Sequence, residues 1–284
     1  MKTASTPQYL ALASIALCLA ACSGSGRVAI SPLPTIQSNY HIQPSQSDTF
    51  QHANYISFSG SFSAMGEDLA DNVQMGQFKF HHAGRAGQFQ YYGGLQLNAG
   101  AYNFDAYGEP VFDAQGNQYP KRRSNFVFSG AIAAGANFAI PVAANFDWRV
   151  IGLEGSWGME SGRYYDYRKT VPDTLMAYVD RRRLQDMYFL TTEMVFRRRR
   201  SGAKFGYQFA VGTNFNRVPY NDSYYFPGSN NNNYNDDGKS TQIIVRNTIH
   251  INRDPVGFYF QIYGARYLAA FNTGITYRLP SRSR

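Results

Sequence analysis

The chain has 284 residues, of which 16% are aromatic and 16% are charged. About 25% charged residues is usual in soluble proteins, so the composition argues against an ordinary soluble globular protein. Nearly all the aromatic residues are Tyr (22) and Phe (21), which favours strands and membrane interfaces. The net charge of +8 suits contact with phosphates or anionic lipids. The two cysteines, Cys18 and Cys22, both lie near the start, which excludes a disulfide framework.

The N-terminal segment begins with Lys2 and continues into an apolar run, Tyr9–Ala21. This run is too short to span a bilayer but long enough for the core of a signal peptide. It ends in Leu19-Ala20-Ala21-Cys22, which resembles the lipobox of bacterial lipoproteins. The resemblance implies cleavage before Cys22, a diacylglycerol on its sulfur, and a further acyl chain such as palmitate on the new amino group. The alternative is an ordinary secretory signal that leaves Cys22 as a free thiol.

Four segments follow from this pattern. Residues 1–21 are the expected signal peptide, and residues 22–52, rich in Ser, Pro and Gln, form a flexible lipid-anchored linker. Residues 53–279 carry the fold, and residues 280–284 form a polar tail.

Alternation of apolar and polar residues with period two dominates the body of the chain and predicts strands. The apolar phase slips near Gly152, which predicts a β-bulge there. The expected strands are Tyr55–Ala64, Met75–His82, Gln88–Ala99, Phe126–Phe138, Phe146–Trp157, Met187–Phe196, Lys204–Phe215, Ile243–Asn252, Val256–Ile262 and Phe271–Leu279.

Short and long connections alternate between these strands. Outer-membrane barrels have short periplasmic turns, long outer loops and an even strand count. We therefore expect an all-β protein, an antiparallel transmembrane β-barrel of about ten strands, with eight to twelve allowed. The start of the first barrel strand and the end of the last one then both lie on the periplasmic side. This predicts that the linker leads to a lipid in the inner leaflet.

The two faces of the strands decide between a membrane barrel and a soluble one. The apolar faces are almost purely Phe, Leu, Ile, Val and Tyr, as lipid exposure requires, so Phe205, Tyr207 and Phe209 should point outward. The polar faces carry Ser, Gln, Asn, Gly and Ala, which suit a narrow lumen. The last strand also resembles the C-terminal assembly signal of outer-membrane proteins through Tyr277, although the tail departs from that signal. The expected location is the cell outer membrane, with a lipid anchor.

Four charged residues are expected to face the lumen. They are Asp147, Arg149, Glu193 and Arg246. One interpretation is a gate or ion path, and the other is an internal salt-bridge network that plugs a small barrel. His81 and His82 are adjacent on a strand and should point to opposite faces, so they cannot bind one metal ion together.

Two basic clusters lie where outer loops meet strands, Lys121-Arg122-Arg123 and Arg181-Arg182-Arg183. They are candidate contacts for lipopolysaccharide phosphates because the Arg fork matches phosphate oxygens. The alternative is a solvated rim. No histidine falls in the expected outer loops, which argues against an enzyme. The segment Asn230–Gly238 lacks the spaced ligands of a calcium loop, and no metal or cofactor is expected.

Three hypotheses for function remain. The first is a non-enzymatic outer-membrane barrel lipoprotein that acts in surface structure, adhesion or an envelope complex through its long loops. The second is a narrow channel for small solutes, and the third is a lipid-tethered soluble β protein that binds a hydrophobic ligand or glycan. The expected partners are membrane lipids, lipopolysaccharide and an envelope protein. Nucleic acid is excluded because the leader exports the chain.

Overall fold

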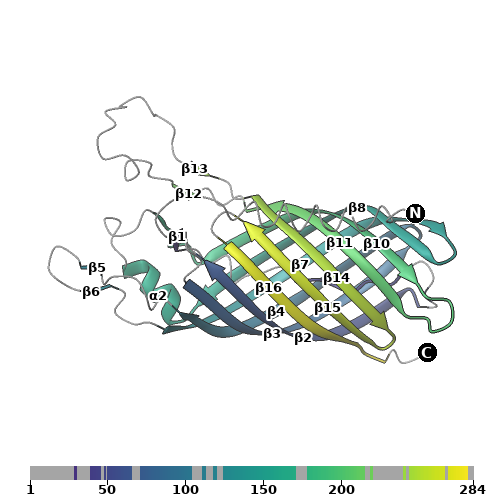
Figure 1. Ribbon diagram of the computed structural model, residues 1–284, viewed down its shortest axis with the longest axis horizontal. Helices are drawn as coiled ribbons and strands as arrows, with labels where there is room; N and C mark the ends of the chain where they lie inside the picture. Colours follow the sequence, from purple (N-terminus) through teal and green to yellow (C-terminus); the bar gives the residue numbers. More distant parts are fainter. Residues whose placement is uncertain are drawn as a thin grey trace, which may run out of the picture.

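A computed structural model of the chain describes residues 29–30, 39–45, 48, 50–65, 71–103, 111–112, 118–119, 124–170, 178–214, 218–219, 239–240, 243–265 and 268–280. Within these residues, ten antiparallel strands close into one barrel (Figure 1). The barrel strands are β2 (His52–Met65), β3 (Asp71–Ala86), β4 (Phe89–Asn103), β7 (Ser124–Ala143), β8 (Phe146–Ser161), β10 (Leu184–Arg197), β11 (Lys204–Thr213), β14 (Ile243–Arg253), β15 (Val256–Ala265) and β16 (Leu268–Arg278). The predicted all-β, antiparallel barrel is confirmed.

The barrel closes where the last strand, β16, pairs with the first, β2. Their register runs from Leu268 opposite Met65 to Arg278 opposite Tyr55. Closure leaves none of the ten barrel strands with an unpaired edge, which is the condition for a sheet in hydrocarbon, where no water satisfies the backbone.

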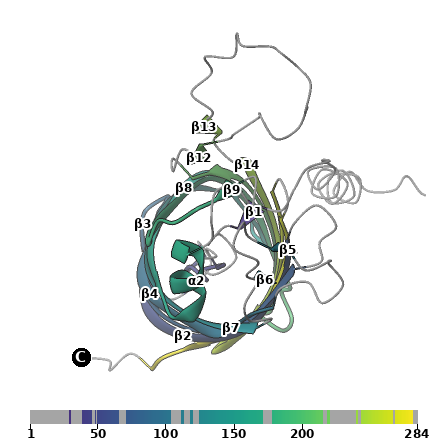
Figure 2. The ribbon, with the colours of Figure 1, turned by 90° about the vertical axis from the view of Figure 1, so that its left-hand side faces the viewer.

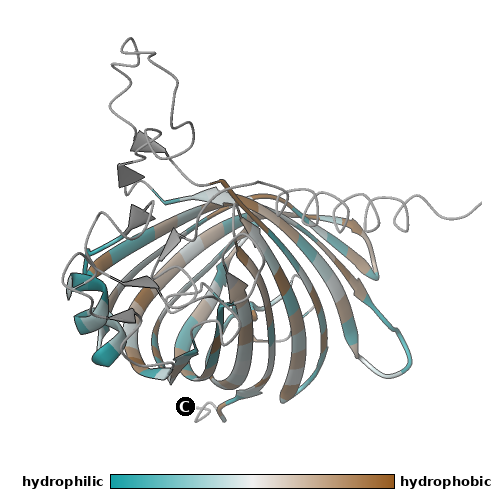
Figure 3. Ribbon diagram, turned by 60° about the vertical axis from the view of Figure 1, so that its left-hand side comes forward, coloured by the Kyte–Doolittle hydropathy of each residue, from teal (hydrophilic) through white to brown (hydrophobic). Residues whose placement is uncertain are grey.

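The outer wall of the barrel is apolar, whereas buried polar side chains line much of its interior. Leu95 and Phe205 are 59% and 46% exposed on the outer wall, although they are large and apolar. Tyr207 and Phe209 alternate with the buried Gln208 and therefore also point outward. Apolar residues recur along the strands, whereas the helix at one end is hydrophilic (Figure 3). This distribution is the reverse of a soluble barrel and matches a wall that faces lipid.

The predicted bulge is present in β8, at Val150. Phe138 of β7 pairs with Ile151 and Ala139 pairs with Arg149, so Val150 is the extra residue. The same step appears against β10, between Thr191 and Glu193. Because the bulge reverses the alternation, Arg149 before it and Glu154 after it both face the lumen.

The two ends of the barrel differ. At one end, which we call the turn end, four links of two to six residues join β3 to β4, β7 to β8, β10 to β11 and β14 to β15. At the loop end, three of the five links span 20 to 29 residues, and β15 and β16 are joined by only two. The long links carry α2 (Arg163–Thr170) and the two-residue strands β5 (Val111–Phe112), β6 (Gln118–Tyr119), β9 (Tyr178–Val179), β12 (Val218–Pro219) and β13 (Lys239–Ser240).

Residues 39–45 differ from the sequence-based expectation. They fall in the segment predicted to be a flexible linker, yet all seven are buried inside the barrel. The lumen is therefore filled by a piece of the chain that precedes the barrel, in addition to the side chains of the wall. Upstream, β1 (Ala29–Ile30) pairs in parallel with β9.

The described residues include no helix with the length and apolar character needed to cross a bilayer. The helix α2 has eight residues and lies across the loop end (Figure 2).

The lipid-facing wall makes a prediction for Leu95, which lies midway along its strand between Phe80 and Ile132. Leu95→Arg should lower the free energy of unfolding by about 2–4 kcal/mol, the cost of a cation near mid-bilayer. Urea titration of the barrel in lipid vesicles measures this loss. As a control, Gln88→Arg in the exposed β3–β4 turn should leave stability unchanged. An unaffected Leu95→Arg protein would indicate a wall that faces water.

Candidate functional site

The site that unites the conspicuous residues is the lumen itself, around residues 39–45. We call these residues the lumen segment. Its backbone follows β3 in order: Lys79 Nζ donates to the Tyr40 carbonyl, His81 Nε2 lies 3.0 Å from the Ile42 carbonyl, and Arg85 Nη1 donates to the Ser45 carbonyl at 2.8 Å. Since β3 runs from the loop end to the turn end, the lumen segment descends toward the turn end.

Side chains of the lumen segment also bind the inner wall. Asn39 Nδ2 donates to Gln77 Oε1 at 2.7 Å, and Asn137 Nδ2 donates to Gln43 Oε1 at 2.9 Å. Asn272 contacts Asn39 as well. These amides come from strands on different sides of the barrel, so the lumen segment bridges the wall from within.

Glu193 of β10 is the centre of the lumen network. Its Oε1 accepts a hydrogen bond from Arg149 Nη1 at 2.6 Å and one from the Tyr40 hydroxyl at 2.8 Å, and His250 Nε2 lies 2.8 Å from the same oxygen. Gln208 Nε2 reaches the other carboxylate oxygen at 3.3 Å. One buried carboxylate thus joins the lumen segment to β8, β11 and β14.

Arg149 of β8 uses the rest of its guanidinium fork within the lumen. Its Nε donates to Gln90 Oε1 at 2.5 Å, and its Nη2 donates to the Gln43 carbonyl at 3.2 Å. The Arg149 and Glu193 side chains are 2% and 0% exposed. A buried ion pair of this kind is tolerated only when its remaining donors and acceptors find partners, and here the lumen segment supplies two of them.

A second buried ion pair joins Arg246 of β14 to Glu154 of β8. Arg246 Nη2 lies 2.5 Å from Glu154 Oε2 and also donates to Gln208 Oε1 at 2.8 Å. Gln208 in turn donates to Glu154 Oε1 at 3.3 Å. Because Gln208 touches both carboxylates, the two ion pairs form one continuous network.

His250 is held in place by close packing. Its ring stacks on Tyr40, with centroids 4.6 Å apart, and it packs over Gly206, its partner on the neighbouring strand β11. A Cβ at Gly206 would lie 2.0 Å from His250 Nε2, so a side chain there would displace the imidazole from Glu193.

The helix α2 lies over one side of the loop-end opening of the lumen (Figure 2). Its Arg168 is fully buried and pairs with Glu160 of β8 at 3.1 Å, and Tyr164 stacks on Tyr102 at 4.1 Å. A buried apolar cluster lies beneath α2 in this half of the barrel, with Val73, Met75, Tyr102, Val127, Met187, Phe189, Ile244, Tyr263 and Leu268 among its members. The prediction of a lumen filled by amides and small residues therefore does not hold for this half, which is filled with larger apolar side chains.

The cluster Arg181-Arg182-Arg183 is engaged within the protein. Arg182 forks onto Asp180, with contacts of 3.0 and 2.7 Å, and Arg183 Nε donates to the Glu160 carbonyl at 3.2 Å. Burial raises the pKa of the Asp180 carboxyl, but the hydrogen bonds and charge of Arg182 lower it more, and the balance keeps the pKa below its ordinary value. The fork of Arg182 is thus occupied by Asp180.

The other predicted residues divide as follows. Arg149, Glu193 and Arg246 meet in the lumen network, and Asp147 is buried on the same face of β8 nearer the turn end. Cys22 and the cluster Lys121-Arg122-Arg123 lie outside the described residues. Sequence reasoning missed Glu154, whose alternation with the apolar Leu153 after the bulge was the available signal. It also missed Tyr40, because nothing in the linker-like composition around this residue indicates that it lies in the lumen.

His81 and His82 point to opposite faces, as expected: His81 is buried in the lumen and His82 is exposed. Within the described part of the chain, no group of three or more His, Cys, Asp or Glu residues has the arrangement of a metal site.

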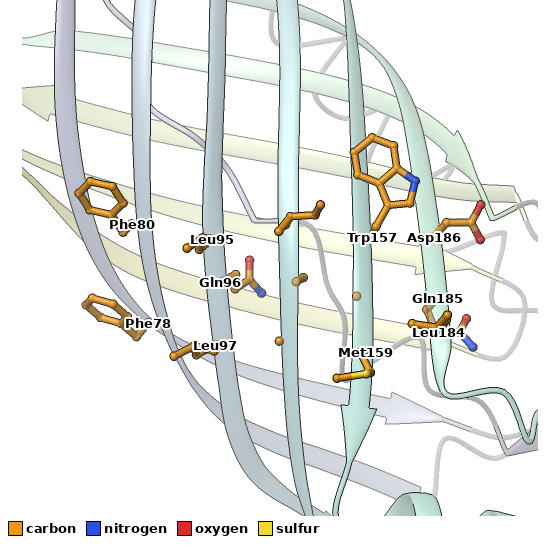
Figure 4. A pocket seen from close by; sticks show the side chains of 14 residues that line it. Phe78, Phe80, Leu95, Gln96, Leu97, Trp157, Met159, Leu184, Gln185 and Asp186 are labelled. Carbon is orange, nitrogen blue, oxygen red and sulfur yellow. The ribbon is translucent and has the colours of Figure 1, made fainter.

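A hollow of about 750 Å³ lies on the outer wall across β3, β4, β7, β8 and β10 (Figure 4). Phe78, Leu97 and Met159 rise around Gly130, whose lack of a side chain makes the depression. Because its lining is almost wholly apolar and belongs to the lipid-facing wall, the hollow suits acyl chains of the bilayer.

Comparison with known proteins gives similarity of structure alone. No protein-family model matches the chain, and no curated protein matches it. Similar solved structures include an outer membrane channel from Pseudomonas putida F1, with 6% identity and a TM-score of 0.42, covering 84% of this chain and 100% of that one. The β domain of the Bordetella autotransporter BrkA gives 10% identity, a TM-score of 0.42, and coverage of 80% and 99%. At these values, no activity or partner of those proteins transfers to this chain.

The Glu193 hub makes a prediction about stability. Glu193→Ala leaves Arg149 buried without its carboxylate and should cost about 3–5 kcal/mol of unfolding free energy. Urea titration in lipid vesicles measures it. The matched control is Asp166→Ala in α2, which removes an exposed pair with Lys169 and should cost at most about 1 kcal/mol. Equal losses in the two variants would show that the lumen pair is solvated.

Proposed function

We propose that this protein is a non-enzymatic outer-membrane β-barrel lipoprotein, anchored through Cys22, which acts in the envelope through its long loops. The observation that carries this proposal is the filled lumen. Residues 39–45 and the Arg149–Glu193 pair occupy the turn-end half, the Arg246–Glu154 pair lies further toward the loop end beside Phe189, and α2 with its apolar cluster occupies the loop-end half. Because the lumen is filled and the outer wall faces lipid, the two ends of the barrel are the surfaces left for contact with a partner.

The loop end carries the longer links. Links of 20, 22 and 29 residues extend there, far longer than the links at the turn end. Long loops on a rigid barrel are the usual carriers of binding function. We therefore assign contact with a partner in surface structure, adhesion or an envelope complex to this end, with lipopolysaccharide as a further partner of the cluster Lys121-Arg122-Arg123.

A narrow channel remains the second candidate, and one observation favours it. The lumen segment is not part of the barrel wall. It crosses the interior as a single extended stretch, held by side-chain hydrogen bonds to the wall. Release of this stretch would open a polar path beside Arg149 and Glu193.

The two candidates predict different conductance in planar bilayers. The wild-type protein should show no steady openings because its lumen is occupied. A variant in which residues 39–45 and residues 163–170 of α2 are each replaced by an equal length of Gly and Ser should conduct, since it lacks both the lumen segment's side chains and the helix at the loop end. Steady openings of the wild type, with a conductance matching that of the variant, would support the channel instead.

The anchor is tested at Cys22. Cells fed labelled palmitate should incorporate the label into the wild-type protein and not into Cys22→Ala. The Cys22→Ala barrel should still change its gel migration on boiling, because the fold does not need the lipid. An unlabelled wild-type protein of the mass expected for a free thiol would contradict the lipoprotein assignment.

A further inference from the structure

The path of the chain before the first barrel strand runs lengthwise through the lumen. Ala29 and Ile30 pair with Tyr178 and Val179 of β9. β9 lies in the link between β8 and β10, and that link is at the loop end. The described chain before β2 therefore begins at the loop end of the barrel, where β1 is drawn in Figure 1.

From there the chain descends to the opposite end. Tyr40 contacts Lys79, Ile42 contacts His81, and Ser45 contacts Arg85. Closer to the turn end, Asp48 forms an ion pair with Lys204, the first residue of β11. β2 then starts at the turn end, where His52 pairs with Gly84. The segment thus passes from one end of the barrel to the other before the barrel strands begin.

The proposed anchor at Cys22 lies close to β1 along the chain. Only six residues lie between Cys22 and Ala29, so the seven steps from one to the other span at most about 25 Å when fully extended. β3 has 16 residues, which at about 3.3 Å each and a tilt of 35–45° give a barrel height of about 40 Å. The stretch from Ala29 back to Cys22 is therefore too short to reach from β1 to the turn end.

An outside path is excluded on a second ground. A chain running along the outer wall would place unpaired backbone groups in hydrocarbon, at a cost of several kcal/mol for each group. Cys22 is therefore restricted to the side of the membrane where the long loops lie.

We propose that the chain is threaded through its own barrel, so that the mature N-terminus emerges on the cell-surface side and the lipid on Cys22 sits in the outer leaflet. This inference rests on the proposed function for the presence of the lipid. It replaces the expectation of an inner-leaflet anchor, which followed from placing the start of the barrel at the periplasmic end. The acyl chains would then hold the long loops against the outer surface of the membrane.

The test uses single cysteines in the full-length protein and a maleimide reagent that does not cross the outer membrane. Ser25→Cys marks the chain three residues after the anchor. Asn232→Cys marks the long link between β11 and β14, and Ser201→Cys marks the exposed turn between β10 and β11. Each variant is labelled in intact cells and again after the outer membrane has been permeabilised.

Threading predicts that Ser25→Cys reacts in intact cells to the same extent as Asn232→Cys, whereas Ser201→Cys reacts only after permeabilisation. A Ser25→Cys protein that follows Ser201→Cys would overturn the proposal. The wild-type protein separates the two claims, because an acylated Cys22 has no thiol to label. If the wild type itself reacts in intact cells, the N-terminus is on the surface but the lipid is absent. Threading then stands and the anchor fails.

Discussion

A buried carboxylate must receive hydrogen bonds from the protein when water is excluded, and Glu193 is the residue on which this structure depends. Arg149, Tyr40, His250 and Gln208 all approach it from different elements. Only one of the four, Tyr40, comes from outside the barrel wall. The charge in the centre of the barrel therefore ties the position of the lumen segment to the closure of the strands around it.

This requirement explains how a chain with few charges and no disulfide framework specifies one interior. The outer wall is nearly uniform in its chemistry and would accept many arrangements, because lipid does not discriminate among Phe, Leu and Ile. The inner wall is specific, since the ion pairs and amides must meet in one register. The bulge at Val150 contributes directly, because it brings Arg149 and Glu154 to the same face of β8. At the loop end, Arg168 of α2 and Glu160 of β8 form another buried ion pair.

The sequence predicted the barrel well because alternation is a local property of each strand. Alternation predicted the strand segments, the bulge and lumen positions for Arg149, Glu193 and Arg246, each from residues within a few positions of one another. It did not show what the lumen charges bind. Tyr40 meets Glu193 across 153 positions, and no local pattern reports such a contact. A Ser-, Pro- and Gln-rich composition predicts a flexible linker in water, but the same amides suit a lumen lined by Gln77, Gln90 and Asn137.

The lumen segment is fixed inside the barrel in this structure, and amide hydrogen exchange measures this most directly. Peptides covering residues 39–45 should exchange as slowly as peptides from β3 and β10, because their amides are shielded from water in the closed interior. In Glu193→Ala the same peptides should exchange faster while β3 stays protected. Exchange of residues 39–45 at the rate of an unstructured chain in the wild-type protein would contradict the account.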